Sequence, residues 1–202
     1  MKEEILYRGA EAVLIRQGDR VLKRRVEKGY LYPSLGERLR KRRTRIEARL
    51  LTRAQSIISV PRVLHVSEKT MEIALEFLDG KKLSVWLDDL DDGCVICEKI
   101  GKHVGGLHDA GIIHGDLTTS NMILVGDKVF FIDFGLGFFS QRTEDKAVDL
   151  HLIKEALEAR HFSRWKEYFD CVLLGYKVSK KADEVLKRLK KVEQRGRYRE
   201  HY

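Results

Sequence analysis

The segment HGDLTTSNMILVGDKVFFIDFG, from His114 to Gly135, places polar side chains at fixed intervals around two apolar runs. Asp116 and Asn121 precede the run MILV, and Asp133 ends the second run, KVFFID. The Gly-Asp pair between the two runs is typical of a tight turn, so the segment predicts a β-hairpin. Because a hairpin brings its two ends together, we expect Asp116, Asn121 and Asp133 to lie close to one another.

The chemistry of these three side chains favours a magnesium site. Mg²⁺ prefers oxygen ligands and keeps several positions for water and for phosphate oxygens. We therefore expect Asn121 and Asp133 to bind a magnesium ion that bridges to a nucleotide. Asp116, five residues before the asparagine, would then be free to accept a proton from an incoming hydroxyl group.

The order and spacing of these residues resemble the catalytic segments of protein kinases. That family's catalytic loop reads H-R-D-L-x-x-x-N, and its metal-binding motif reads D-F-G. His114-Gly115-Asp116-Leu117 followed by Asn121 keeps the first spacing and replaces only the arginine, and Asp133-Phe134-Gly135 matches the second motif completely. The resemblance implies an α+β, two-lobed, reduced protein-kinase-like fold, with a strand-rich N-terminal lobe and a helical C-terminal lobe.

A protein kinase also needs a strand lysine that binds the α- and β-phosphates and a helix glutamate that holds this lysine. Lys23, in RVLKRR, and Glu47, in RTRIEAR, match these positions. Glu47 lies at the boundary of an apolar stripe, where an unpaired carboxylate would be costly, so we expect it to pair with Lys23. Lys28 is a competing choice for the lysine, and an exposed surface position is the alternative for Glu47.

Two further stretches are expected to contact the nucleotide. The glycine-rich phosphate loop of kinases is reduced here to one glycine, in the run Gly9, Ala10, Glu11 and Ala12. Backbone amides in such a loop cover phosphates less freely, which favours a modest affinity for ATP. Glu76 and Leu78 lie at the end of a predicted strand, where kinases place the hinge that binds adenine.

Hydrophobic periodicity predicts strands with one helix in the first eighty residues and mainly helices after a break at Asp79-Gly80. The first helix is expected to run to about Gln55, with Ser34 as its cap and Glu37 completing a capping box. The expected strands are a hairpin over residues 11–26 and single strands over 62–66 and 71–77. A helix is expected over residues 92–110, and later helices have Thr143 and Ser179 as caps and Gly196 as a stop.

These patterns divide the chain into three regions: an N-terminal lobe over residues 1–79, a C-terminal lobe over 80–195 and a basic tail over 196–202. After the D-F-G motif, the stretch LGFFSQRTEDKAVDL is too short for a usual activation loop and contains no A-P-E. Regulation by phosphorylation of this loop is therefore not expected. Asp149, within this stretch, is expected to fix the catalytic loop and not to take part in the chemistry.

Four stretches narrow the resemblance: RGAEA near the N-terminus, RKRRTRIEARLL around Glu47, HGDLTTSN and the basic RGRYR of the tail. Together they resemble the small atypical Ser/Thr protein kinase of the KEOPS complex, a family similar to the p53-related and RIO kinases. The resemblance covers essentially the whole chain. It implies ATP and Mg²⁺ as cofactors, phosphorylation of serine or threonine, and ATPase activity. It also implies assembly with a threonylcarbamoyl transferase subunit and other KEOPS subunits, in the modification of tRNA to threonylcarbamoyladenosine.

Charge and composition agree with an ordered protein that attracts polyanions. The 202 residues carry a formal charge of +8, and cationic side chains gather in residues 38–49 and 187–199. Such clusters attract nucleic acid, and a solvated helix face is the alternative. No apolar run approaches the roughly 20 residues that cross a bilayer, and the first residues lack the pattern of a signal peptide, so we expect a cytoplasmic protein without membrane contact.

The three cysteines predict neither a disulfide framework nor a metal site. Cys94 and Cys97 form a CxxC without a second pair, and they are expected to be two small apolar positions on a helix. We therefore assign no metal through sulfur.

Two other functions remain open on the sequence. A pseudokinase that binds nucleotide without turning it over is favoured by the missing glycines, but it has no need of Asp116. A small-molecule kinase, such as an aminoglycoside or sugar phosphotransferase, can also begin its catalytic loop with H-G-D. About seventy residues after D-F-G leave little room for the enlarged substrate pocket that those enzymes build.

Overall fold

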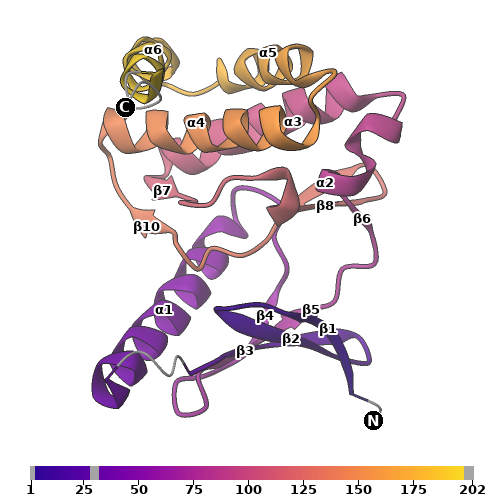
Figure 1. Ribbon diagram of the computed structural model, residues 1–202, viewed down its shortest axis with the longest axis vertical. Helices are drawn as coiled ribbons and strands as arrows, with labels where there is room; N and C mark the ends of the chain where they lie inside the picture. Colours follow the sequence, from indigo (N-terminus) through magenta and orange to yellow (C-terminus); the bar gives the residue numbers. More distant parts are fainter. Residues whose placement is uncertain (1–2, 28–31, 198–202) are drawn as a thin grey trace.

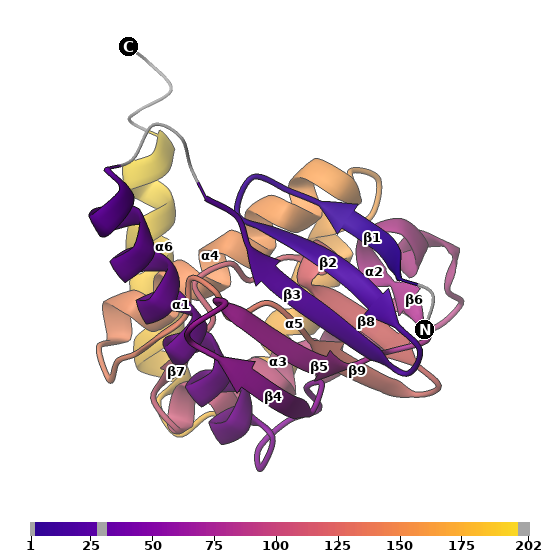
Figure 2. The same cartoon turned by 90° about the horizontal axis from the view of Figure 1, so that it is seen from below.

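The computed structural model describes residues 3–27 and 32–197, and it consists of a five-stranded antiparallel sheet and a layer of helices (Figure 1). In the order in which they pair, the strands are β1 (Glu4–Arg8), β2 (Ala12–Gln17), β3 (Arg20–Arg25), β5 (Glu72–Glu76) and β4 (Val63–Ser67). Helix α1 (Pro33–Ala54) extends from the sheet to the helical layer, as Figures 1 and 2 both show. The expected α+β fold, with a strand-rich first part and a helical second part, is confirmed.

The helical layer carries two small sheets on the side that faces the large one. Its helices are α2 (Leu83–Trp86), α3 (Gly93–Asp109), α4 (Thr143–Arg160), α5 (Trp165–Tyr176) and α6 (Ala182–Arg197), with 3₁₀ turns η1 (Leu87–Asp89) and η2 (Thr119–Asn121). The small sheets are β6 (Lys81–Lys82) with β8 (Met122–Val125) and β9 (Lys128–Phe131), and β7 (Ile112–Ile113) with β10 (Phe138–Phe139). The predicted hairpin between the catalytic motifs is therefore present as β8 and β9, and Gly126 turns it with a φ of 59°.

Strand β3 presents two cationic side chains to the interior. Successive side chains of a strand point to opposite faces, so Val21, Lys23 and Arg25 share one face. All three are buried, whereas Arg24 between them is exposed. The strand thus directs one lysine and one arginine towards the same side of the sheet.

Helix α1 begins one residue before the expected cap. Tyr32 is the N-cap and Pro33 is the first helical residue, where proline's missing N–H costs nothing. The predicted capping box of Ser34 and Glu37 is wrong, because Ser34 lies inside the helix, and Glu37 pairs instead with Lys41 at 2.5 Å. The apolar residues that α1 buries lie in its second half and include Leu50, Leu51 and Ala54.

Helices α3 and α5 pack closely because each carries a glycine at the contact. A Cβ atom on Gly101 would lie 1.9 Å from the carbonyl oxygen of Val172, and one on Gly175 would lie 2.0 Å from that of Glu98. Only glycine lets two backbones approach to this distance. This pair forms the rigid base of the helical layer.

The same two helices are joined by a disulfide between Cys94 and Cys171. The expectation of no disulfide framework is therefore wrong. The two cysteines are separated by 77 positions in the sequence, and only the packing of α3 against α5 brings them together. Cys97 remains a free, buried thiol, as expected of an apolar helix position. Burial raises the pKa of Cys97 to about 12.

The ends of the later helices differ from the prediction. Arg142, not Thr143, is the N-cap of α4. Ser179 lies before α6 and bonds to Asp109 at 2.8 Å, so it does not cap that helix. Helix α6 continues through Gly196 to Arg197, and residues 198–202 of the predicted basic tail lie outside the described residues. Within the described ranges, every helix is too short or too polar to traverse a lipid bilayer.

Reduction of the Cys94–Cys171 disulfide is expected to lower the free energy of unfolding by about 2–4 kcal/mol, because the cross-link restricts the unfolded chain. Urea unfolding with and without a reductant measures the loss. Cys171→Ser is the matched control, since a reductant should not destabilise that variant further. Thiol titration of the unfolded, unreduced chain should find one thiol, that of Cys97, and three reactive thiols would contradict the pairing.

Gly101→Ala is expected to destabilise the protein by about 1–3 kcal/mol or more, because the added methyl group forces α3 and α5 apart. Gly106→Ala is the control on the same helix, where a Cβ would meet only Cγ2 of Ile57, at 3.1 Å. Alanine favours a helix over glycine by up to about 1 kcal/mol, so this control should be near neutral or stabilising. Equal unfolding midpoints for the two variants in urea would argue against the close packing.

Candidate active site

Lys23, Glu47 and Asp133 form a cluster of charges where β3, α1 and the segment after β9 meet. Nζ of Lys23 donates to Oε1 of Glu47 and to Oδ1 of Asp133, at 2.6 Å in both cases. The Glu47 side chain is completely buried, and that of Lys23 is 7% exposed. Glu47 is therefore no surface residue, and the structure brings it together with Lys23. Lys28, the competing lysine, lies outside the described residues.

Arg25 is a second cation at the same glutamate, and it was not predicted from the sequence. Its Nη2 group donates to Oε2 of Glu47, and the residue is 7% exposed. Within a run of basic residues Arg25 had no distinguishing feature of its own. Its only signal was the strand period of two, which places it on the same face as Lys23.

Asp133 is held in its ionised form. Burial acts to raise the pKa of this carboxyl, but the charge and hydrogen bond of Lys23 outweigh it, so the pKa lies below its ordinary value. The backbone N–H of Gly135 donates to the same Oδ1 at 3.2 Å, and Arg25 adds positive charge. The side chain of Asp133 is 45% exposed, so a negative carboxylate is open to solvent here.

Asn121 contacts Asp116 directly. Its Nδ2 group donates to the backbone carbonyl of Asp116 at 2.9 Å and to Oδ2 of Asp116 at 2.8 Å. The backbone N–H of Ile132 donates to the carbonyl of Asn121 at 2.9 Å, and Nε2 of His114 lies 3.1 Å from the carbonyl of Ile132. These bonds hold the segment that carries Asp133 beside the loop that carries the other two residues.

The available oxygens fit a hard cation. The carboxylate of Asp133 is ionised, and the amide nitrogen of Asn121 is used by Asp116, which leaves its amide oxygen for a ligand. Lys23 occupies Oδ1 of Asp133, so a cation would compete with it for that atom. Within residues 3–27 and 32–197, no three His, Cys, Asp or Glu side chains gather to hold a metal. A magnesium ion here would thus depend on oxygens from a bound ligand, such as phosphates.

Asp149 anchors the loop between β7 and η2, in keeping with the role expected for it. Its two carboxylate oxygens accept the backbone N–H groups of His114 and Gly115, each at 2.9 Å, and Nε2 of His108 lies 3.2 Å from Oδ2. Burial acts to raise the pKa of this carboxyl, but the hydrogen bond and charge of His108 and the bonds from the loop outweigh it. The pKa of Asp149 therefore lies below its ordinary value.

The backbone conformation explains why Gly115 stands where kinases have an arginine. Gly115 has a φ of 78°, and a Cβ atom there would lie 2.4 Å from the carbonyl oxygen of Leu136. A side chain at this position would meet both backbone strain and a direct collision. The H-G-D form of the motif is therefore required by the path of the backbone.

A second anchor, also missed in the sequence, holds the other end of the loop. Nε2 of His161 lies 3.2 Å from the hydroxyl of Thr119, and its Nδ1 lies 2.9 Å from a carboxylate oxygen of Asp88. Thr119 and His161 are both buried. Because the three residues lie far apart in the sequence, no local pattern indicated this contact.

The four residues expected to cover phosphates form the turn between β1 and β2. The backbone N–H of Gly9 donates to the carbonyl of Ala12 at 3.0 Å, and Ala12 is buried as the first residue of β2. Ala10 is exposed, and the carboxylate of Glu11 pairs with Arg43 of α1. Contact of this turn with a nucleotide stays a prediction.

The residues of the predicted hinge lie at the end of β5. The carboxylate of Glu76 bonds to Arg62 at 3.1 Å, and its backbone N–H donates to the carbonyl of the same residue. Leu78 is half-buried between β5 and β6. Their contact with adenine likewise stays a prediction.

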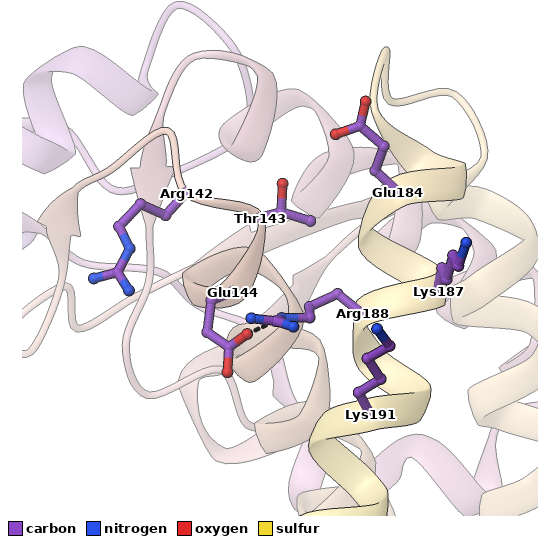
Figure 3. A pocket seen from close by; sticks show the side chains of 7 residues that line it. All are labelled: Arg142, Thr143, Glu144, Glu184, Lys187, Arg188 and Lys191. Carbon is purple, nitrogen blue, oxygen red and sulfur yellow. Dashed lines mark hydrogen bonds and ion pairs between the residues drawn. The ribbon is translucent and has the colours of Figure 1, made fainter.

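A hollow of about 450 Å³ lies between α4 and α6, at the end of the molecule far from the large sheet (Figures 1 and 3). It is lined by Arg142, Thr143, Glu144, Glu184, Lys187, Arg188 and Lys191. Glu144 pairs with Arg188 across it, as the dashed line in Figure 3 shows, and with Arg195. Since it contains none of the residues around Asp133, we do not take it as the catalytic site.

Asp149→Asn is expected to lower the free energy of unfolding by about 2–4 kcal/mol at neutral pH, because it removes the charge that three donors share. The folded pKa of Asp149 is depressed, so its contribution is complete above the unfolded pKa of about 3.9 and is lost as the pH falls through the folded pKa.

Urea unfolding of parent and variant at pH 7 and near pH 3 checks this prediction, with the exposed Asp170→Asn as control. That control should stay within about 0.5 kcal/mol of the parent. A difference for Asp149→Asn that is as large near pH 3 as at pH 7 would contradict the linkage.

Comparison with known proteins identifies the family of the chain. Residues 24–148, more than half of the chain, match the family model described as the RIO domain. The chain is 43% identical to the KEOPS complex subunit Bud32 of Pyrococcus abyssi, over 89% of this chain and 84% of that protein. It is 38% identical to a probable bifunctional tRNA threonylcarbamoyladenosine biosynthesis protein of Methanobrevibacter smithii, over 98% of this chain but only 37% of that longer protein.

Solved structures show the same fold at low identity. The Rio2 kinase of Chaetomium thermophilum, in an ADP/Mg²⁺-phosphoaspartate complex, superposes with a TM-score of 0.63 at 15% identity, over 96% of this chain and 70% of its own. WaaP, in complex with acyl carrier protein, superposes with a TM-score of 0.62 at 17% identity, over 100% of this chain and 90% of its own. The family match, the identity along most of both chains and the shared fold place this chain in the RIO-domain family of atypical kinases, in the group that contains the KEOPS subunit Bud32.

Proposed function

We propose that the chain is a Mg-ATP-dependent phosphotransferase with Ser/Thr protein kinase and ATPase activity. The observation that carries the proposal is the cluster in which Lys23 bonds to both Glu47 and Asp133. In the kinase fold a lysine of this kind binds phosphates, the glutamate holds the lysine, and the aspartate binds Mg²⁺. A bound magnesium ion would offset the negative charge of the phosphates.

Each residue of the site has a separate role in the proposed phosphoryl transfer. With a nucleotide bound, Lys23 would bond to phosphate oxygens in place of Asp133, and Oδ1 of Asp133 and the amide oxygen of Asn121 would be the ligands that hold a cation. Asp116 accepts the proton of the attacking hydroxyl or of a water molecule. Asn121 holds one carboxylate oxygen of Asp116, which fixes the direction of the other. The turn from Gly9 to Ala12 covers the phosphates, and Glu76 and Leu78 contact adenine.

The names of the relatives support a role in tRNA modification. One relative is a KEOPS complex subunit, and the chain corresponds to about a third of bifunctional proteins of tRNA threonylcarbamoyladenosine biosynthesis. We therefore propose that this chain assembles in the cytoplasm with a threonylcarbamoyl transferase subunit and other KEOPS subunits, and that it supports their action on tRNA. The cationic residues of α1 and α6 fit a polyanionic partner.

Asp116→Ala is expected to keep the affinity for Mg-ADP within about threefold and to lower ADP production from ATP by about 10²-fold or more, because it removes a proton acceptor without touching a phosphate contact. Isothermal titration and an ADP-release assay measure the two quantities. Asp127→Ala, at the exposed tip of the β8–β9 hairpin, is the control and should match the parent.

Turnover by Asp116→Ala at the parent rate would remove Asp116 from this role. The assay is run with and without the transferase subunit and tRNA. A parent chain that binds Mg-ADP but forms no ADP under any of these conditions would be a pseudokinase, and the proposed activity would fail.

A further inference from the structure

Glu47 has a cationic donor on each of its two carboxylate oxygens. Lys23 bonds to Oε1 and Arg25 bonds to Oε2, and the glutamate itself is completely buried. The proposed function uses only the first of these two cations. The second comes from the same strand, two residues further along, and its side chain is 5% exposed.

The surroundings of Arg25 tie it to Glu47 and to the segment after Asp133. Among the described residues, its Nε is a buried polar atom without a hydrogen-bond partner, so the bond to Glu47 is its principal polar contact. A Cβ atom on Gly135 would lie 3.1 Å from Nη2 of Arg25 and 3.5 Å from Oε2 of Glu47. Backbone at the metal motif therefore lies against this ion pair.

Lys23 is shared by two carboxylates that differ in their exposure. Asp133 is 45% exposed and can be compensated by solvent or by a cation, whereas Glu47 is fully buried. If Lys23 turned towards phosphates, solvent or a cation could take its place at Asp133. Among the residues that the structure describes, Arg25 is the other cation bonded to Glu47. It matters because an uncompensated buried charge is strongly unfavourable.

We propose that Arg25 is a positioning residue for nucleotide binding. It keeps Glu47 compensated, and thereby keeps α1 in place, while Lys23 exchanges Asp133 for the phosphates of a nucleotide. Without Arg25, Glu47 and the phosphates compete for Lys23 alone. The loss of Arg25 therefore destabilises the nucleotide-bound protein more than the nucleotide-free protein. The inference rests on the proposed function, because it concerns how that same site binds its nucleotide.

Arg25→Met is expected to raise both the KM for ATP and the dissociation constant of Mg-ADP by about tenfold or more, which corresponds to one hydrogen bond to a charged group. The kcat should change by less than about threefold, because Asp116 and Asn121 keep their contacts. Arg25→Lys should return both constants to within about threefold of the parent, since it restores a cation at Oε2. Arg24→Met is the matched control, because Arg24 is exposed on the opposite face of the strand and pairs with Glu72.

A second comparison uses Glu47→Gln, in which there is no charge for Arg25 to compensate. In that background Arg25→Met should weaken Mg-ADP binding by less than about threefold, so the double-mutant cycle shows coupling. Parent-like affinity in Arg25→Met would overturn the inference. Two other outcomes would also overturn it and leave Arg25 a structural residue. One is that Arg25→Met and Arg25→Lys weaken Mg-ADP binding equally, and the other is that Arg25→Met weakens it equally with Glu47 and with Gln at that position.

The two proposals fail in different ways. A parent chain that binds Mg-ADP but releases no ADP from ATP contradicts the proposed activity alone, and the affinities of the Arg25 variants still decide the inference. A parent that turns over ATP, with an Arg25→Met variant of unchanged affinity, contradicts only the inference. A parent that binds no nucleotide overturns both.

Discussion

The burial of the Glu47 carboxylate is the constraint on which the arrangement of this protein depends. Removing a charge from water costs several kcal/mol, and only close cations with good hydrogen bonds offset that cost. Lys23 and Arg25 supply them because they occupy alternate positions of β3 and so share a face. A slip of β3 by one residue would turn both cations away from α1. The Glu47 carboxylate therefore sets the register of β3 against α1. Lys23, which bonds to Glu47, also bonds to Asp133 and so holds the segment that carries it.

The loop from His114 to Asn121 places irregular backbone inside a packed protein. Buried backbone N–H groups need partners, and this loop has no long strand or helix to provide them. Asp149 of α4 accepts two of these groups, and His161, at the end of α4, contacts Thr119 at the other end of the loop. Since α4 and α6 pack together and α3 and α5 approach through glycines, the anchors belong to a closely packed layer. The loop is thus positioned by helices that contribute no residue to the proposed chemistry.

The fold of this chain is shared by proteins of very different sequence. Structures with 15% and 17% identity share the fold over nearly the whole chain, so the arrangement of the elements does not require most of the residues that build it here. This chain carries, in the order found in protein kinases, a strand lysine, a helix glutamate, the H-G-D loop and the D-F-G motif. The change from arginine to glycine in the loop follows from the left-handed φ of Gly115, so the path of the backbone explains it.

Local patterns along the chain were enough to predict the α+β class, the two hairpins and the extents of α1 and α3. Each of these depends on neighbours in the sequence: alternation in a strand, the helical repeat or turn residues. The pairing of Lys23 with Glu47 was predicted from the resemblance to protein kinases. Helix caps were predicted less well, since Ser34, Thr143 and Ser179 have the composition of caps but lie inside a helix or in other contacts. The second cation on Glu47, the Cys94–Cys171 disulfide and the contact of His161 with Thr119 could not be read from the sequence. They join segments that are 22 to 77 positions apart in the sequence. Only the packing of the helices and the sheet excludes water from these groups and brings them within bonding distance, and it thereby selects them from the other arginines, cysteines and histidines of the chain.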